Sequence, residues 1–160
     1  MKNRRLLQTL VLGAGIAVIG LVPSLAAAGE TFSGERVTVS SDKSFEDVTN
    51  ALKGLVAKNG MMVMAEVDQG KMLSMTGLNL KATLYLVGNP TVGKQLFEQD
   101  HAVGLYVPLR VFVYSDASGK TSISYDKPSS LLSLFQNPQV KMVAEMLDQK
   151  LESLANMAAR

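Results

Sequence analysis

The stretch from Gly88 to Lys94 reads GNPTVGK, the G-x-x-x-x-G-K spacing of a loop that holds nucleotide phosphates. In such a loop a Ser or Thr follows the lysine and ligates magnesium, and here that position is Gln95. The motif also belongs on a parallel sheet built from crossover units, which the predicted elements below do not provide. We therefore interpret Gly88-Asn89 as a strand end, Pro90 as the first residue of a helix and Lys94 as a solvated side chain, and we expect no nucleotide binding.

Methionine is concentrated in one short region of the chain. Met61, Met62, Met64, Met72 and Met75 fall within fifteen residues. Thioethers are soft ligands that select Cu(I), and on a strand Met62 and Met64 share one face while Met61 lies on the other. Met72 and Met75 lie one turn apart if their segment is helical. Two interpretations stay open: a periplasmic Cu(I)-handling protein, and flexible filler of an irregular core, which we favour.

The other side chains that could perform chemistry lack partners in the sequence. His101 is the single histidine, and the chain has no Cys with which it could form a metal site. Glu66 and Asp68 share a strand face, an arrangement that is common for solvated carboxylates. Ser122 and Ser124 form the polar side of a strand without a glycine-flanked nucleophile elbow. We therefore expect no cofactor, no metal and no catalytic residue, and a function in binding rather than catalysis.

The N-terminal residues are typical of a secretory signal peptide. Lys2, Arg4 and Arg5 precede an uncharged run from Leu10 to Val22, which is shorter than a bilayer-spanning helix. Small residues at the end of segment 1–28 are suited to cleavage. We therefore expect export across the inner membrane, most simply to the periplasm, and no membrane attachment after cleavage.

Removal of segment 1–28 leaves 132 of the 160 residues, with 13 basic against 14 acidic side chains and a net charge of −1. No run of Lys and Arg remains that could follow a phosphate backbone, so we expect no nucleic-acid partner. The remaining chain has the length of one ordinary domain. We divide it into a flexible lead at 29–35 and a single domain at 36–158.

The polarity pattern predicts the order strand, helix, several strands, long helix. The predicted strands are 36–40, 61–68, 81–87, 103–107, 111–115 and 121–125, and the predicted helices begin at Ser44, Pro90 and Asn137. The first of these helices ends at Asn59-Gly60, and the second ends at Gln99. Because βαβ units are missing, we predict an α+β domain: an antiparallel or mixed sheet of five to six strands with helices packed on one face.

Three motifs on these elements resemble the domain of unknown function family 302. They are Gly88-Asn89-Pro90, Pro108-Leu109-Arg110 leading an apolar strand that ends at Asp116, and Tyr125-Asp126-Lys127-Pro128. The resemblance extends from about Val37 to Leu154. It implies a compact α+β domain, similar to the TATA-binding-protein-like architecture, and pairing as a dimer, but no activity. Members usually read Asp-Leu-Pro-Leu-Arg where this chain has Tyr106-Val107-Pro108, so a role of that acidic position is not carried over.

Several predicted strands are apolar on both faces, whereas a sheet with helices on one side needs one apolar face. The second face is predicted to carry Met62, Met64, Tyr85, Phe112 and Tyr114. The helix at Pro90–Gln99, a partner subunit or an apolar ligand could cover this face. We predict these five residues as ligand-binding, with Arg110 near the rim, and as partner either a small amphipathic ligand or a second copy in a homodimer.

Overall fold

The structure is a computed structural model that describes residues 34–160, so the predicted signal peptide and most of the predicted lead lie outside the described residues. Its strands are β1 (Arg36–Ser41), β2 (Met62–Asp68), β3 (Ala82–Gly88), β4 (Leu109–Ser115) and β5 (Thr121–Asp126). Its helices are α1 (Phe45–Lys58), α2 (Gln69–Ser74), α3 (Pro90–Phe97), the 3-10 helix η1 (His101–Leu105), α4 (Pro128–Leu131) and α5 (Pro138–Ala159).

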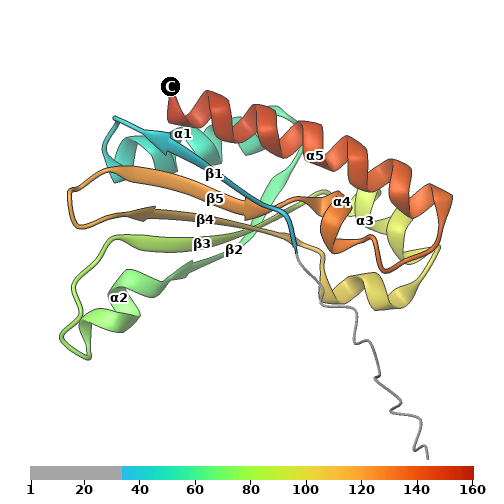
Figure 1. Cartoon of the computed structure of the whole chain (residues 1–160), viewed down its shortest axis with the longest axis horizontal. Helices are drawn as coiled ribbons and strands as arrows, with labels where there is room; N and C mark the ends of the chain where they lie inside the picture. Colours follow the sequence, from blue (N-terminus) through green and yellow to red (C-terminus); the bar gives the residue numbers. More distant parts are fainter. Residues whose placement is uncertain (1–33) are drawn as a thin grey trace, which may run out of the picture. The chain divides into compact units, whose positions relative to one another are not determined.

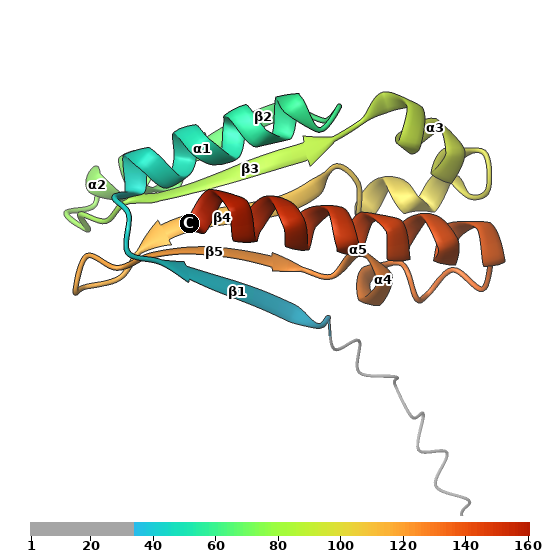
Figure 2. The same ribbon diagram turned by 90° about the horizontal axis from the view of Figure 1, so that it is seen from above.

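The five strands form one sheet in the order β1-β5-β4-β3-β2, and every neighbouring pair is antiparallel. Helices α1 and α5 lie side by side on one face of this sheet (Figures 1 and 2), where α1 contacts β2 and β4 and α5 contacts β1 and β5. Helix α2 lies on the opposite side, at the left of Figure 1. The prediction of an α+β domain with the order strand, helix, strands, helix is confirmed.

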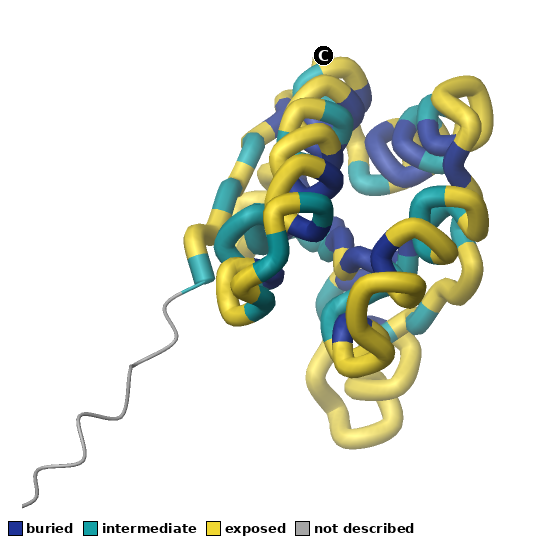
Figure 3. Tube along the Cα trace, turned by 90° about the vertical axis from the view of Figure 1, so that its right-hand side faces the viewer, coloured by how far each residue is buried: buried dark blue, intermediate teal, exposed yellow. Residues whose placement is uncertain are grey.

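Helix α1 begins where the sequence predicts it. The side chain of Ser44 accepts a hydrogen bond of 3.1 Å from the backbone N–H of Asp47, which satisfies one of the free donors of the first turn. One stripe of this helix, Val48, Leu52 and Val56, is buried against the sheet. The buried residues therefore gather on the inner side of the helix, and the outer turns are exposed (Figure 3).

Helix α5 has a cap of the same kind. Asn137 accepts from the backbone N–H groups of Gln139 and Val140, at 2.8 and 3.2 Å, and Pro138 occupies the first turn. Its buried stripe is Val140, Val143, Ala144, Leu147, Leu151, Leu154, Ala155 and Ala158. Although α5 has 22 residues, neither it nor another helix within 34–160 combines the length and the apolar character needed to cross a bilayer.

The core lies between these two helices and the sheet, and it includes two tyrosines. Tyr125 on β5 is 4% exposed, and burial raises the pKa of its phenol to about 12, with the negative charges of Glu152 and Asp148 adding to the rise. Burial also raises the pKa of Tyr85 on β3. Both phenols therefore stay neutral near neutral pH.

The prediction of a strand at 103–107 was wrong, because these residues belong largely to η1. The side chain of Asp100 accepts a hydrogen bond of 2.8 Å from the N–H of Ala102 and caps this short helix. Val103 is fully buried, whereas Leu105 is 85% exposed, so the two residues do not share the single buried face that a strand would give them. The one-turn helix α4 was also not predicted. A helix near α2 was considered only as a possibility that would place Met72 and Met75 one turn apart.

Candidate functional site

The face of the sheet opposite α1 and α5 is called here the open face. The strand register assigns to it Arg36, Thr38 and Ser40 of β1; Ser122, Ser124 and Asp126 of β5; Arg110, Phe112 and Tyr114 of β4; Ala82, Leu84, Leu86 and Gly88 of β3; and Met62, Ala65 and Val67 of β2. Polar side chains therefore occupy β1 and β5, and apolar side chains occupy β3 and β2. Strand β4 lies at the border between these two halves.

A hollow of about 440 Å³ lies at this border and is called here the open-face hollow. It is lined by Arg36, Thr38, Gln69, Leu84, Arg110, Phe112, Tyr114, Ser124, Tyr125 and Asp126. Gln69 is the first residue of α2, so the hollow is bounded by this helix as well as by four strands. Ligand sites in proteins are typically concave and mostly apolar with a few polar groups. The open-face hollow is more polar than this, and its apolar part is confined to residues of β3 and β4 and to Tyr125.

The apolar floor of the open-face hollow is a pair of aromatic rings. Phe112 and Tyr114 are two residues apart on β4 and therefore point to the same side of the sheet. Their ring centroids lie 5.2 Å apart, and the planes differ by 19°, so the rings stack. Leu84 lies directly opposite Phe112 on β3. Because Phe112, Tyr114 and Leu84 are each half-buried, they retain apolar surface that a flat molecule can cover.

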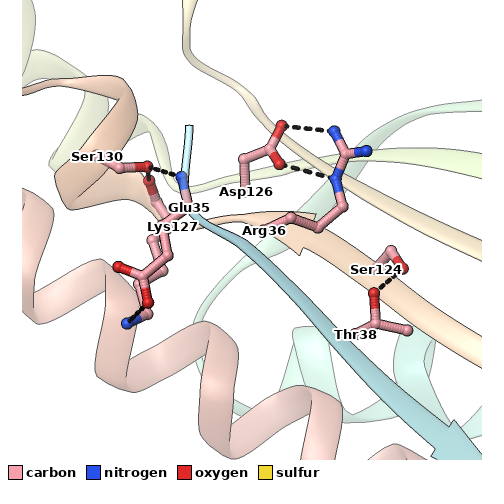
Figure 4. A network of polar contacts seen from close by, with 7 residues as sticks. All are labelled: Glu35, Arg36, Thr38, Ser124, Asp126, Lys127 and Ser130. Atoms are coloured by element: carbon pink, nitrogen blue, oxygen red, sulfur yellow. Dashed lines mark hydrogen bonds and ion pairs between the residues drawn. The ribbon is translucent and has the colours of Figure 1, made fainter. Parts of the chain in front are cut away.

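Of the two arginines that line the hollow, one is paired with a carboxylate within the described residues and the other is not. Arg36 donates to both carboxylate oxygens of Asp126, at 3.0 and 3.3 Å, and this hydrogen-bonded pairing raises the pKa of Arg36 (Figure 4). Within residues 34–160, by contrast, no ion pair involves Arg110, which is exposed. The negative charge of Asp126 is thus already compensated. Arg110 is the cation that remains free to meet an anion.

Polar contacts between β1 and β5 hold the polar wall of the hollow in place (Figure 4). The hydroxyl oxygens of Thr38 and Ser124 share a hydrogen bond of 2.7 Å. At the start of β1, the backbone N–H of Glu35 donates to Ser130 at 2.9 Å, and the carboxylate of Glu35 pairs with Lys127. These contacts join residues about 90 positions apart in the sequence, and they reduce the side-chain reorganisation that ligand binding would require.

The structure brings three of the predicted site residues together and separates the others. Arg110, Phe112 and Tyr114 line the open-face hollow. The prediction that Tyr85 shares their face was wrong: Tyr85 is paired with Val111, is 1% exposed, and lies in the core. Leu84 occupies the position that was expected for Tyr85, because the alternation along β3 is shifted by one residue relative to the prediction.

Sequence reasoning missed six residues of the hollow in addition to Leu84: Arg36, Thr38, Gln69, Ser124, Tyr125 and Asp126. Arg36 and Thr38 alternate with apolar residues along β1, so their common face could be inferred, but their place in one hollow with residues of β4, two strands away, depends on the strand order. Gln69 enters the hollow only because α2 follows β2 directly. No sequence signal indicated its position.

Met62 and Met64 lie at the start of β2, away from the hollow. Met62 is paired with Gly88 and is 49% exposed. Met64 is the extra residue of a β-bulge, and its methyl carbon lies 3.1 Å from the position that a Cβ on Gly88 would take. By this pairing Met62 shares the face of Leu84 and Phe112, as predicted, but neither Met62 nor Met64 lines the open-face hollow.

The five clustered methionines do not converge on one site. Met61 is 6% exposed and belongs to the core, whereas Met72 and Met75 are exposed in and after α2. Strand β2, about 20 Å long at the usual rise per residue, separates Met62 from the start of α2. Among residues 34–160, no group of three or more His, Cys, Asp or Glu side chains could hold a metal ion.

The remaining candidate residues cap helices, pair with a charge on the surface or lie exposed. Asn89 caps α3 by accepting from the N–H of Thr91 at 2.7 Å, so GNPTVGK is a strand end and a helix start, as predicted from Pro90. Asp68 caps α2, and Glu66 lies 3.6 Å from Lys53 of α1. His101 is exposed at the start of η1.

Curated relatives of this chain are found in Brucella. Fluoride-specific ion channel FluC 1 of Brucella suis biovar 1 (strain 1330) is 32% identical over 96 residues, which are 59% of this chain and 38% of that protein. FluC 1 of Brucella abortus biovar 1 (strain 9-941) is 32% identical over 96 residues, which are 59% of this chain and 36% of that protein. The chain thus matches a little over a third of the length of these relatives. The name fluoride-specific ion channel refers to those whole proteins and not to the matched part.

A solved structure and a family model cover more of the chain. The crystal structure of an uncharacterized conserved DUF302 protein from Bacillus stearothermophilus matches 78% of this chain and 98% of its own chain, with a TM-score of 0.71 and 21% sequence identity. This likeness shows the fold. The family model described as domain of unknown function DUF302 matches residues 37–158, which confirms the resemblance found in the sequence. The chain therefore belongs to the DUF302 family.

Proposed function

We propose that the open-face hollow binds a small amphipathic anion. The flat apolar part of this ligand lies on the rings of Phe112 and Tyr114, and its negative group pairs with Arg110. One observation carries the proposal: a stacked aromatic pair and an exposed, unpaired arginine, alternating on β4, line the same hollow. The N-terminal sequence supports the further proposal that the protein works in the periplasm.

The chemistry of the hollow favours an anion over a cation or a neutral molecule. The planar guanidinium of arginine offers two parallel N–H donors, which match a carboxylate or a phosphate. The hydroxyl groups of Thr38 and Ser124 and the amide of Gln69 lie on the same hollow and can orient further polar atoms of a ligand. Asp126 would repel an anion, but its pairing with Arg36 offsets this charge.

We expect 1-naphthoate, a flat aromatic carboxylate, to bind the purified protein, and Arg110→Gln to weaken this binding about tenfold. The neutral analogue 1-naphthamide should bind the wild type and Arg110→Gln equally, because it lacks the charge that pairs with the guanidinium. Phe112→Ala should weaken both ligands by removing half of the stacked floor. Isothermal titration calorimetry measures all four combinations of ligand and Arg110 variant, which form a cycle that isolates the charge interaction.

The matched control is Lys120→Gln, which removes a cation from the neighbouring β4–β5 turn, where Lys120 lies 3.9 Å from Asp42. This variant should bind 1-naphthoate as the wild type does. Equal losses in Lys120→Gln and Arg110→Gln would show a general charge effect rather than a site. An Arg110→Gln variant with unchanged affinity for 1-naphthoate would also contradict the proposal.

Self-association through the open face is a second candidate function. Val67, Leu84, Leu86, Phe112 and Tyr114 lie on three adjacent strands of this face and are each half-buried, so they form a continuous apolar surface. We expect size-exclusion chromatography with light scattering to detect a dimer at high protein concentration, and Leu86→Asp to abolish it. A wild type that stays monomeric throughout would exclude the dimer and leave the ligand proposal intact.

A further inference from the structure

A second hollow lies between α3, the end of β3 and the segment that leads into β4, and it is called here the α3 cavity. Its volume is about 310 Å³. Its lining includes Met64, Val87, Lys94, Leu96, Phe97 and Leu147. The cis peptide bond between Val107 and Pro108 lies in its wall, as does the segment Gly88-Asn89-Pro90. The cavity therefore lies where two of the family motifs meet.

The floor of the α3 cavity belongs to the hydrophobic core. Val87 is fully buried, Leu96 is 1% exposed and Leu147 is 4% exposed, and all three are members of the core cluster. Protein cores are close-packed and contain few voids larger than a water molecule. An apolar cavity of this size offers little to water and gains dispersion contacts when an apolar molecule fills it.

Two exposed side chains, Met64 and Phe97, line the cavity where it opens to solvent. Met64 is 44% exposed, and its flexible thioether lies over Gly88. Phe97 is 41% exposed, and its ring rests on η1, where a Cβ on Gly104 would lie 3.0 Å from the ring carbon Cζ. Because neither side chain is locked in the core, an elongated apolar group can enter between them.

Among the described residues that line the cavity, Lys94 is the only charged one. It is 74% exposed and lies 3.5 Å from Glu98, one turn further along α3, whose side chain is 57% exposed. Such a surface ion pair contributes little to stability, so the ammonium group can exchange Glu98 for a ligand anion. The polar atoms of Asn89 are already engaged by the N–H groups of Thr91 and Val92 and by the carbonyl of Gly60.

We infer that the α3 cavity binds a medium-chain fatty acid, with the alkyl chain between Met64, Val92 and Phe97 and the carboxylate beside Lys94. The buried side chains of Val87, Leu96 and Leu147 form the layer beneath this chain. Apart from Asn89 and Lys94 the lining is apolar, and Phe97 is its single aromatic residue, which suits a flexible alkyl chain better than a flat ring. The single cation at the mouth complements one terminal negative charge. This site is separate from the open-face hollow, and the two share no lining residue.

The test uses octanoate, butyrate and 1-octanol as probes in isothermal titration calorimetry of the purified chain. Octanoate should bind more tightly than butyrate by about fourfold for each additional methylene that becomes buried. In Lys94→Gln the dissociation constant for octanoate should rise about three- to tenfold, and the constant for 1-octanol should stay unchanged. Absence of octanoate binding, or equal octanoate affinity in the wild type and Lys94→Gln, would overturn the inference.

The chain provides a closely matched control in Lys141→Gln. Lys141 lies on α5 and pairs with Glu145 one turn further on, at 3.9 Å, and its side chain is 76% exposed. This variant removes the same charge from the same kind of ion pair outside the cavity, so octanoate affinity should be unchanged. An equal loss in Lys141→Gln would show a non-specific charge effect and contradict the inference.

Methyl resonances locate the bound chain independently of any substitution. Octanoate should shift the methyl signals of Val87, Leu96 and Leu147 and leave the ring signals of Phe112 and Tyr114 unchanged. Arg110→Gln should bind octanoate as the wild type does, which separates this site from the open-face hollow. Shifts confined to Phe112 and Tyr114 would refute the α3 site, whatever the outcome for the open face.

Discussion

We expect the replacement of Tyr85 by alanine to lower the free energy of unfolding by about 3–5 kcal/mol, the usual cost of removing a large buried ring. Tyr85 is 1% exposed and lies among the core residues beneath α1. Thr83 and Thr49 are polar neighbours of its phenol, so the substitution also removes these polar contacts. Urea denaturation followed by far-ultraviolet circular dichroism measures the change.

Tyr114→Ala is the matched control for this prediction, because it removes the same side chain from a half-buried position on the open face. We expect its cost to be less than half that of Tyr85→Ala. Tyr85→Phe removes only the hydroxyl group and should cost about 1 kcal/mol. Similar losses in the two alanine variants would contradict the assignment of Tyr85 to the core.

Replacing Gly70 by alanine should lower the free energy of unfolding by about 1–3 kcal/mol, because the methyl group has no room. A Cβ at this position would lie 2.3 Å from the carbonyl oxygen of Leu80 and 3.2 Å from the backbone nitrogen of Ala82. Both atoms belong to the backbone, so no side-chain rotation relieves the contact. Because Gln69 precedes Gly70 in α2, a displaced helix should also weaken 1-naphthoate binding in the open-face hollow.

Gly54→Ala makes the same chemical change as Gly70→Ala, but we expect it to change the free energy of unfolding in the opposite direction. Gly54 is exposed in α1, and no heavy atom lies within 4 Å of a Cβ built there. Alanine should therefore raise the free energy of unfolding by about 0.5–1 kcal/mol through its better helix propensity. Thermal and urea denaturation of both variants test the pair. A stabilised Gly70→Ala variant would show that α2 does not pack against the β3 backbone as described.

The capped helices and the polar alternation of β1 could be predicted from the sequence because their signals are local. Ser44 and Asn137 cap α1 and α5 through hydrogen bonds to residues two or three positions ahead. The long stripe of α5 repeats at helical spacing, so its buried face follows from the sequence alone. The α+β class follows from the order of these elements.

The division of residues between the two faces of β3 could not be predicted, because Leu84, Tyr85, Leu86 and Val87 are all apolar or amphipathic. The pairing of Tyr85 with Val111 assigns it to the core, and this pairing is a contact between residues 26 positions apart. The open-face hollow has the same origin. Arg36 on β1 and Arg110 on β4 line it together because both strands are neighbours of β5 in the sheet, and the sequence does not indicate this strand order.

The bulge at Met64 also affects how the sheet ends. β2 is one of the two outermost strands, and between Val63 and Ala65 its pairing with β3 shifts by one residue. A bulge bends the strand and breaks the regular spacing of its backbone N–H and C=O groups. A foreign strand approaching β2 would therefore find matching hydrogen-bond partners along only part of its length. This irregular border disfavours the edge-to-edge polymerisation through which exposed sheets grow into fibrils.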